Sequence, residues 1–198
     1  RGTSRPHRGS SRGLGGGCFT WVTHAERRTS IVYCAVDGEL WWQDGMRLDQ
    51  LTAGGRTVRA PAVAERSLQP GVHRFVVYAV EDAEIWMLEL ESGGRRRLAD
   101  GRHEFCFDPA IAPDEATVSW QRWSRPHMPW DAAERVDLDL ATGSLTTWRP
   151  VDGAVQQPRF TPRGQPVHVH DGVGWLNVSV ADRAVVAEAI EHATPTWG

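Results

Sequence analysis

A repeating order of short segments is the feature that most constrains how this chain can fold. Four pairs of residues each follow an apolar segment and a turn, and each precedes a further segment of strand length. These markers are Leu40-Trp41, Ile85-Trp86, Val136-Asp137 and Trp175-Leu176. Their spacings of 45, 51 and 39 residues, with three or four short strands in each unit, are typical of the blades of a β-propeller.

Each repeat unit contains segments with the length and composition of four strands. The first strand is expected at 17–22, 58–63, 105–111 and 156–160, and the second at 30–36, 74–80, 116–123 and 166–170. The last strand is expected at 47–51, 95–99, 144–148 and 183–187. Asp37-Gly38 and Asp171-Gly172 accept the positive φ of hairpin turns. The prediction is an all-β chain, a partial β-propeller of about four blades of antiparallel strands. A β-sandwich, whose strands also recur every ~8 to 12 residues, is the alternative.

Expected domain boundaries follow from these units. A basic head rich in Gly and Arg, residues 1–14, is predicted to be disordered because it holds too few apolar side chains to collapse. The partial propeller is expected over residues 15–198. Its blades are expected at 15–55, 56–103, 104–152 and 153–191, and residues 192–198 are expected to begin another blade.

Charge is divided unevenly along the chain. Residues 1–30 carry six arginines and one acidic residue, whereas the whole chain has a formal charge of -3. A basic tail can bind nucleic acid or anionic lipid, but this one is rich in glycine and has no aromatic residue before Phe19. No apolar run reaches the about 18 residues that a membrane span needs, and the start does not resemble a signal peptide. We therefore expect a cytoplasmic protein without a nucleic-acid or membrane partner.

Cysteines and histidines indicate no cofactor. Cys18, Cys34 and Cys106 are odd in number and have no CxxC spacing, so buried reduced thiols are expected rather than a disulfide framework or a zinc site. His168 and His170 lie two residues apart, which places both imidazoles on one face of a strand and permits metal binding. Asp171 is the only third ligand apparent nearby. Structural or surface histidines are therefore expected here, and we predict no cofactor.

A segment with three tryptophans and two prolines, residues 120–131, interrupts the third unit. A strand can include 117–123, but Pro126 and Pro129 lack amide donors and bias the residues before them to extended conformations, so strand pairing must stop there. The sequence predicts an aromatic loop that projects from a sheet. Its side chains have the composition of an interface hot spot. The candidates for an interface or for a substrate cavity are Trp123, Arg125, His127, Met128, Trp130 and Asp131.

The other tryptophans divide into two groups. Trp41, Trp86 and Trp175 recur at equivalent positions of the repeat, so we expect them to pack between blades. Trp42 does not recur and is a further candidate for a contact surface.

Several motifs carry a family resemblance. They are the segments Gly15-Gly16-Gly17-Cys18-Phe19, Asp108-Pro109-Ala110-Ile111-Ala112-Pro113-Asp114, Val118-Ser119-Trp120-Gln121-Arg122-Trp123, Pro126-His127-Met128-Pro129-Trp130-Asp131, Asp171-Gly172-Val173-Gly174-Trp175-Leu176-Asn177 and Pro195-Thr196-Trp197-Gly198. Together they resemble the propeller of the prolyl oligopeptidase family, in its acylaminoacyl-peptidase and dipeptidyl-aminopeptidase-like bacterial branch. One departure is Arg12-Gly13-Leu14, where that branch has His-Glu-Tyr.

The resemblance implies a propeller of about seven blades joined to a C-terminal α/β-hydrolase domain with a Ser, Asp and His triad. We therefore expect a non-catalytic N-terminal propeller fragment that gates or docks onto a missing hydrolase domain. The hydrolase domain and, in the intact parent, short peptides would be its partners.

Two other functions stay open. A stand-alone propeller could bind a protein or a carbohydrate. An enzyme complete within these residues would need a nucleophile, and Gly9-Ser10-Ser11-Arg12-Gly13 does match Gly-x-Ser-x-Gly. No apolar strand precedes this motif and glycines follow it, so nothing would hold Ser11 beside a base, and we expect no catalytic residue.

Overall fold

The computed structural model describes residues 17–24, 28–64, 73–102, 105–186, 189–190 and 192. Within these ranges the chain forms four antiparallel sheets of four strands each, and one short helix. The whole of the expected head, residues 1–14 with Ser11, and the segment 193–198 lie outside the described residues.

Each sheet is a meander whose strands follow one another in chain order. The first sheet holds β1 (Phe19–Thr23), β2 (Thr29–Cys34), β3 (Leu40–Asp44) and β4 (Arg47–Gln50). The second holds β5 (Val58–Ala62), β6 (Phe75–Val80), β7 (Glu84–Glu89) and β8 (Arg95–Ala99). The third holds β9 (Phe105–Ile111), β10 (Thr117–Trp123), β11 (Glu134–Asp139) and β12 (Leu145–Trp148), with α1 (Pro129–Ala132) between β10 and β11. The fourth holds β13 (Val155–Phe160), β14 (Pro166–His170), β15 (Asn177–Val180) and β16 (Arg183–Ala184).

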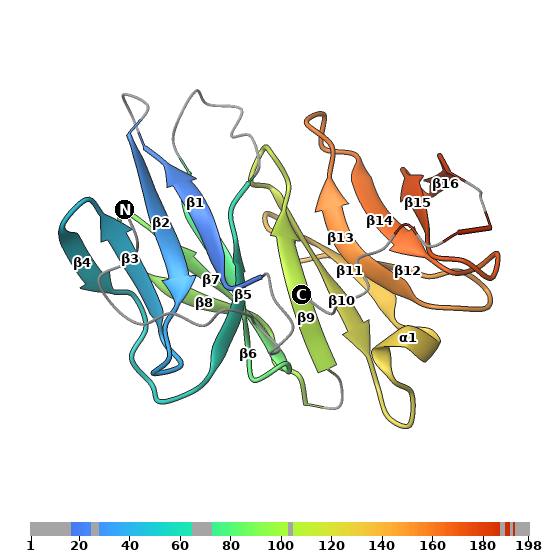
Figure 1. Cartoon of the computed structure of the whole chain (residues 1–198), viewed down its shortest axis with the longest axis horizontal. Coiled ribbons are helices and arrows are strands. Elements are labelled where there is room, and N and C mark those ends of the chain that lie inside the picture. Colours follow the sequence, from blue (N-terminus) through green and yellow to red (C-terminus); the bar gives the residue numbers. More distant parts are fainter. Residues whose placement is uncertain are drawn as a thin grey trace.

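The four sheets stand side by side in chain order (Figure 1). Their first strands lie next to one another, because β1 contacts β5, β5 contacts β9 and β9 contacts β13. The first strands of the four sheets therefore form one continuous side, and each sheet packs against the next along it. This arrangement confirms the predicted all-β partial propeller and excludes the β-sandwich, in which two sheets would cover each other.

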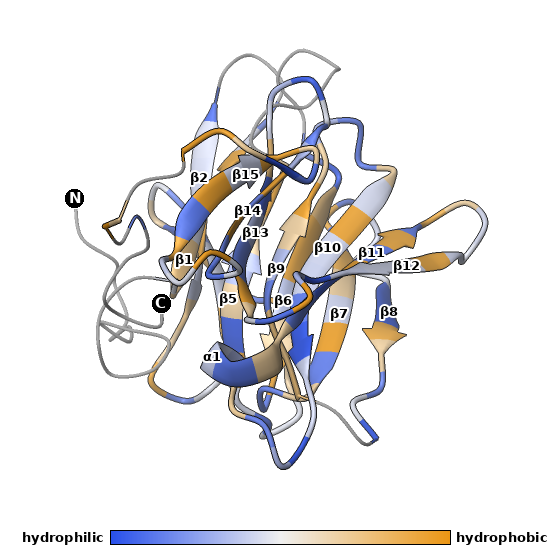
Figure 2. Ribbon diagram, turned by 90° about the vertical axis from the view of Figure 1, so that its right-hand side faces the viewer, coloured by the Kyte–Doolittle hydropathy of each residue, from blue (hydrophilic) through white to orange (hydrophobic). Residues whose placement is uncertain are grey.

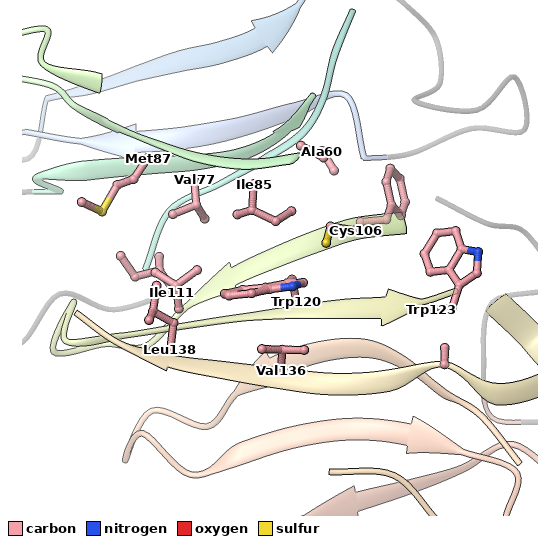
Figure 3. Packing of buried hydrophobic residues seen from close by; sticks show 14 of the residues in the cluster. Ala60, Val77, Ile85, Met87, Cys106, Ile111, Trp120, Trp123, Val136 and Leu138 are labelled. Atoms are coloured by element: carbon pink, nitrogen blue, oxygen red, sulfur yellow. The ribbon is translucent and has the colours of Figure 1, made fainter. Parts of the chain in front are cut away.

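The largest core cluster fills the space between the second and third sheets. Figure 3 shows Val77 and Ile85 of the second sheet pointing toward Trp120, Ile111 and Leu138 of the third. Each of these five side chains is buried. Burial of one large apolar side chain stabilises a fold by roughly 1.5–3 kcal/mol, so contacts between neighbouring sheets account for much of the stability.

Hydropathy follows the strand pattern. Apolar positions run along the strands through the middle of the molecule, whereas the loops at both ends are largely hydrophilic (Figure 2). In β6, five consecutive residues from Val76 to Val80 are buried, because both faces of this strand contact a neighbouring sheet. The second sheet is thus covered on its two sides by the first and the third.

The first strands of three sheets share a β-bulge at the residue before a proline. Ala60, Asp108 and Gln157 adopt positive φ values of 48°, 50° and 53°, and each precedes a proline. The strand register shifts at each of these points. Bulges and prolines that cannot donate a hydrogen bond protect exposed strand edges from pairing. Such protection fits strands whose free edges face the centre of the arrangement.

Two details differ from the strand predictions. The marker Trp175-Leu176 lies in a turn, and β15 begins only at Asn177, because the connection after β14, residues 171–176, is one residue longer than the connection 35–39 of the first sheet. The last strand of the fourth sheet ends at Ala184 rather than at 187. The expected strand end at Trp123 and the expected burial of all three cysteines are confirmed.

Gly101 lies close to the backbone of Ala83 in another connection, and Gly143 is a matched glycine in open space. Gly101 and Gly143 both have positive φ, of 61° and 74°. A Cβ at Gly101 would collide with the carbonyl group of Ala83, whereas nothing lies within 4 Å of a Cβ at Gly143. We expect Gly143→Ala to lower the free energy of unfolding by about 1 kcal/mol, and Gly101→Ala to lower it by about 3 kcal/mol or more. Urea titration measures both, and equal losses would contradict the close approach.

Candidate interaction surface

The aromatic loop, residues 124–133, contains a single turn of helix within an otherwise extended path. Strand β10 ends at Trp123, and Pro129 occupies the first turn of α1, where its missing amide hydrogen costs nothing. The Asp131 carboxylate accepts a hydrogen bond of 2.8 Å from the Met128 amide and closes this turn. The prediction that a loop follows the end of β10 is confirmed, and the sequence did not predict the helical turn within it.

Hydrogen bonds tie this loop to the fourth sheet. The buried Gln121 donates from Nε2 to the carbonyl oxygen of Val155 at 2.9 Å and to that of Pro129 at 3.4 Å. The Val155 amide donates to the Ala133 carbonyl oxygen at 2.9 Å. The loop is therefore held at both its helix and its end against the start of β13.

One predicted interface residue, Trp123, belongs to the core. Its side chain is 6% exposed and stacks on Phe105, with ring centroids 5.4 Å apart and planes at 16°. The Arg125 guanidinium lies 5.8 Å from the Phe105 ring centre. Expecting a contact surface at Trp123 was wrong, because the last residue of β10 turns toward the second sheet rather than outward. Arg125 lies in the loop, and its guanidinium contacts the Phe105 ring of this aromatic pair.

The remaining predicted residues lie on the surface. Met128 and Trp130 are 46% and 51% exposed, and His127 and Asp131 are exposed as well. Trp130 lies on α1, which contacts β13. The loop thus presents one thioether and one indole beside the junction of the third and fourth sheets.

Further exposed apolar side chains lie at the same end of these two sheets. The start of β13 pairs with the end of β14 and adjoins the end of the aromatic loop, so the three connections 124–133, 149–154 and 171–176 lie at one end. The exposed large apolar residues on them are Met128, Trp130, Val151, Val173 and Trp175. We call this set the apolar end surface. Trp175 was expected to pack between blades, but it is 42% exposed because it lies in the long turn after β14.

Close packing makes two of these connections rigid. The Asp171 carboxylate accepts a hydrogen bond of 2.6 Å from the Ala154 amide. Side chains are excluded at two glycines, because a Cβ at Gly153 would collide with that carboxylate and a Cβ at Gly172 would lie 2.7 Å from the Cβ of Pro150. The backbone beneath the apolar end surface is therefore well fixed, which lowers the entropic cost of binding a partner.

The other tryptophan predictions have mixed outcomes. Trp86 is partly buried against the core between the first and second sheets, as expected. Trp41 is buried, but the cluster that it forms with Tyr33 holds residues of the first sheet alone, so packing between blades stays a prediction for Trp41. Trp42, a candidate for a contact surface, packs against that same core, and its indole nitrogen donates to Ser30 Oγ. Trp42 therefore contributes to the core.

A charged network joins the third and fourth sheets. Arg135 of β11 is buried, and its guanidinium donates to Asp137 Oδ2 at 3.0 Å, to Asp182 Oδ1 at 2.8 Å and to His168 Nδ1 at 2.8 Å. We call these four residues the polar seam. Burial and the adjacent Arg135 charge lower the pKa of His168 to about 4, so the imidazole is neutral at neutral pH.

His168 and His170, which were expected to be structural or surface histidines, both contact neighbouring strands. His168 lies 4.3 Å from the Trp148 ring, measured between ring centroids, and His170 Nε2 lies 3.0 Å from Ser179 Oγ. Among the described residues, no group of three His, Cys, Asp or Glu side chains could hold a metal ion. Both imidazoles therefore join neighbouring strands.

A groove of about 300 Å³ lies between the first strands of the four sheets. Its polar wall includes an ion pair of 3.0 Å between Asp108 of β9 and Arg159 of β13. Ala60 and Pro61 line the opposite side.

The described residues contain no helix that is long and apolar enough to cross a lipid bilayer.

Comparison with solved structures identifies the architecture. The whole chain matches 33% of a puromycin-hydrolyzing peptidase from Mycobacterium tuberculosis, with a TM-score of 0.77 and 21% sequence identity. The fold is that of a β-propeller. A puromycin hydrolase matches 88% of the chain over 31% of its own length, with a TM-score of 0.57 and 20% identity. TolB from Acinetobacter baumannii matches 85% of the chain over 40% of its own length, with a TM-score of 0.55 and 17% identity.

The chain spans about a third of the length of the peptidases that it matches. These neighbours include prolyl endopeptidases, which belong to the family that the sequence resembles. No family model and no curated protein matches the sequence.

The polar seam predicts how the stability of the propeller depends on pH. His168 has a pKa of about 4 when folded and of about 6.5 when unfolded. Between these values the unfolded chain takes up a proton that the folded chain does not, so the free energy of unfolding falls as the pH falls. The expected loss between pH 6.5 and 4 is about 3 kcal/mol.

Urea titrations between about pH 7 and pH 4 measure this loss. His168→Gln should remove this part of the pH dependence, whereas His127→Gln, in the exposed loop, should retain it. An equal pH dependence in His168→Gln and in the unaltered chain would show that His168 is not the titrating group.

Proposed function

We propose that this chain is the propeller portion of a serine peptidase and that its apolar end surface docks onto an α/β-hydrolase domain that cleaves short peptides. In this proposal the propeller itself has no catalytic role and limits which substrates reach the hydrolase domain. The docking residues are Met128 and Trp130 of the aromatic loop together with Val151, Val173 and Trp175.

The observation that carries this proposal is the comparison with the puromycin-hydrolyzing peptidase. All of this chain matches one third of that peptidase with a TM-score of 0.77. A match of this extent leaves two thirds of the peptidase for other parts. It supports a parent that also contains more than the four sheets described.

The apolar end surface supports docking at that position. Buried interface centres are rich in Trp and Met, and a few large side chains carry most of the binding free energy. Trp130, Met128 and Trp175 are side chains of this kind, on connections fixed by Gln121 and Asp171. Arg125 and Asp131 at the margin supply polar groups for a rim.

Catalysis within the described residues has little chemical support. Two serine hydroxyls lie beside a histidine: Ser30 Oγ is 2.7 Å from His24 Nε2, and Ser179 Oγ is 3.0 Å from His170 Nε2. Both serines lie on strands and are at most 2% exposed, so no substrate carbonyl can reach them. A serine nucleophile instead needs an accessible turn between a strand and a helix.

The reading frame that follows the codon for Gly198 provides a direct test. The proposal expects further four-stranded units and then a strand, a sharp turn with Gly-x-Ser-x-Gly and a helix. A stop codon directly after Gly198, together with stable monomeric folding of the chain, would overturn the proposal in favour of a stand-alone binding module. Hydrolysis of a chromogenic aminoacyl substrate by the isolated chain would instead favour a complete enzyme.

Mutation of one exposed tryptophan tests the docking surface in the longer protein. Trp130→Ala should weaken docking by about 2 kcal/mol, because truncation of a central tryptophan removes a large apolar contact. The expected result is faster proteolysis between the two domains and a lower kcat/KM for short peptides. Thermal unfolding of the isolated propeller should change little, because Trp130 is half exposed.

Leu145→Ala is the matched control. Leu145 is 53% exposed, close to the 51% of Trp130, but it follows the β11–β12 hairpin at the opposite end of the third sheet. This variant should leave proteolysis and kcat/KM unchanged. Equal effects of the two substitutions would place the docking surface elsewhere.

A further inference from the structure

Two of the buried cysteines lie opposite each other on neighbouring strands. The register of β1 and β2 pairs Phe19 with Tyr33, and one further step along both strands places Cys18 opposite Cys34. A backbone hydrogen bond of 2.7 Å from the Cys34 amide to the Cys18 carbonyl oxygen confirms this pairing. The spacing of the two residues in the sequence does not reveal it.

Their side chains also point to the same side of the sheet. Both belong to the buried cluster that contains Val22, Val32 and Leu40, between the first and second sheets. Cys18 and Cys34 form a hydrogen-bonded pair of the antiparallel ladder, and the Cα atoms of such a pair lie about 5.5 Å apart. Disulfides span Cα distances of about 4.4–6.8 Å, so this spacing permits a bond between the two thiols once the Cβ atoms approach by about 1 Å.

We propose that Cys18 and Cys34 form a redox-sensitive pair, whose disulfide fastens the first strand of the propeller to the second. This role is independent of the docking proposed above. Cys106 cannot substitute for either partner, because it lies on β9 in the cluster between the second and third sheets.

Strand β1 is the element that such a bond would stabilise most. It pairs only with β2 among the described strands, and two of its five residues, Phe19 and Trp21, are largely exposed. Strands with few buried contacts open locally more often than core strands. Opening of β1 gives an oxidant access to the two thiols, and the disulfide then opposes further opening.

The chemistry is a thiol–disulfide exchange with a low-molecular-weight disulfide as the oxidant. One cysteine thiolate attacks the small disulfide, forms a mixed disulfide and releases one small thiol. The second cysteine thiolate attacks the protein sulfur of that mixed disulfide, forms the Cys18–Cys34 bond and releases the second small thiol. The protein loses two protons and two electrons, and the small disulfide is reduced to two thiols.

Burial raises the pKa of the Cys18 thiol. The thiolate is the reactive form, so the reaction should be slow at neutral pH and faster in alkaline buffer.

Peptide mapping of the folded full chain tests the proposal, with oxidised glutathione as the probe at about pH 8.5. Remaining thiols are alkylated in denaturant, and the chain is digested with trypsin without reduction. We expect a disulfide between the peptides that contain Cys18 and Cys34, and alkylation of Cys106. The oxidised chain should unfold at a temperature about 5–10 °C higher than the reduced chain.

Two variants separate the possible outcomes. Cys106→Ser should form the same disulfide, whereas Cys34→Ser should form no intramolecular disulfide. Recovery of Cys18 and Cys34 as alkylated thiols from the oxidised folded chain would overturn the proposal. A disulfide that includes Cys106, or an unchanged unfolding temperature after complete Cys18–Cys34 oxidation, would also overturn it.

Discussion

Packing of each sheet against the next is the interaction on which the rest of this structure depends. A four-stranded sheet with two apolar faces cannot bury both within itself. Here the second sheet is covered on one side by the cluster around Val32 and Tyr78 and on the other by the cluster around Ile85 and Trp120. In such arrays stability is a sum of contacts between neighbours, so the order of the sheets along the chain also determines their order in space.

The three contacts between sheets differ in chemistry. Apolar side chains fill the first two, whereas the contact between the third and fourth sheets contains the buried Arg135 and its three hydrogen-bonding partners. Loss of one partner of a buried guanidinium leaves an uncompensated charge, which is strongly destabilising. The hydrogen bonds of the polar seam therefore oppose a rotation of the fourth sheet against the third.

The orientation of the fourth sheet against the third also affects the candidate interaction surface. The apolar end surface combines residues from both of these sheets, so its shape depends on their relative orientation. Arg135 and Gln121 are register partners on β11 and β10, so the Arg135 network and the bonds of Gln121 and the Val155 amide all join the two sheets near the end where the surface lies. Met128, Trp130 and Trp175 are consequently held at fixed relative positions before any partner binds, which reduces the cost of association.

The repeat of apolar segments and turns predicted most of the fold, because a strand requires only a local alternation of residues and a turn requires only a local dipeptide. The two prolines after Trp123 predicted the end of β10 and the loop that follows it for the same reason. Burial of particular tryptophans was harder to predict. Trp123 and Trp175 exchanged their expected roles, because Trp123 is the last residue of β10 and faces the core, whereas Trp175 lies in the turn before β15 and faces solvent.

By itself, therefore, the sequence determined the all-β class, the number of repeat units and the position of the aromatic loop, all of which depend on residues close together in the chain. Only the tertiary structure decided which distant residues meet. It brought Cys18 opposite Cys34, placed Arg135 beside His168 and Asp182, and gathered the exposed side chains of three connections at one end. These contacts depend on strand register and on the angle between sheets, and no local pattern of residues encodes either.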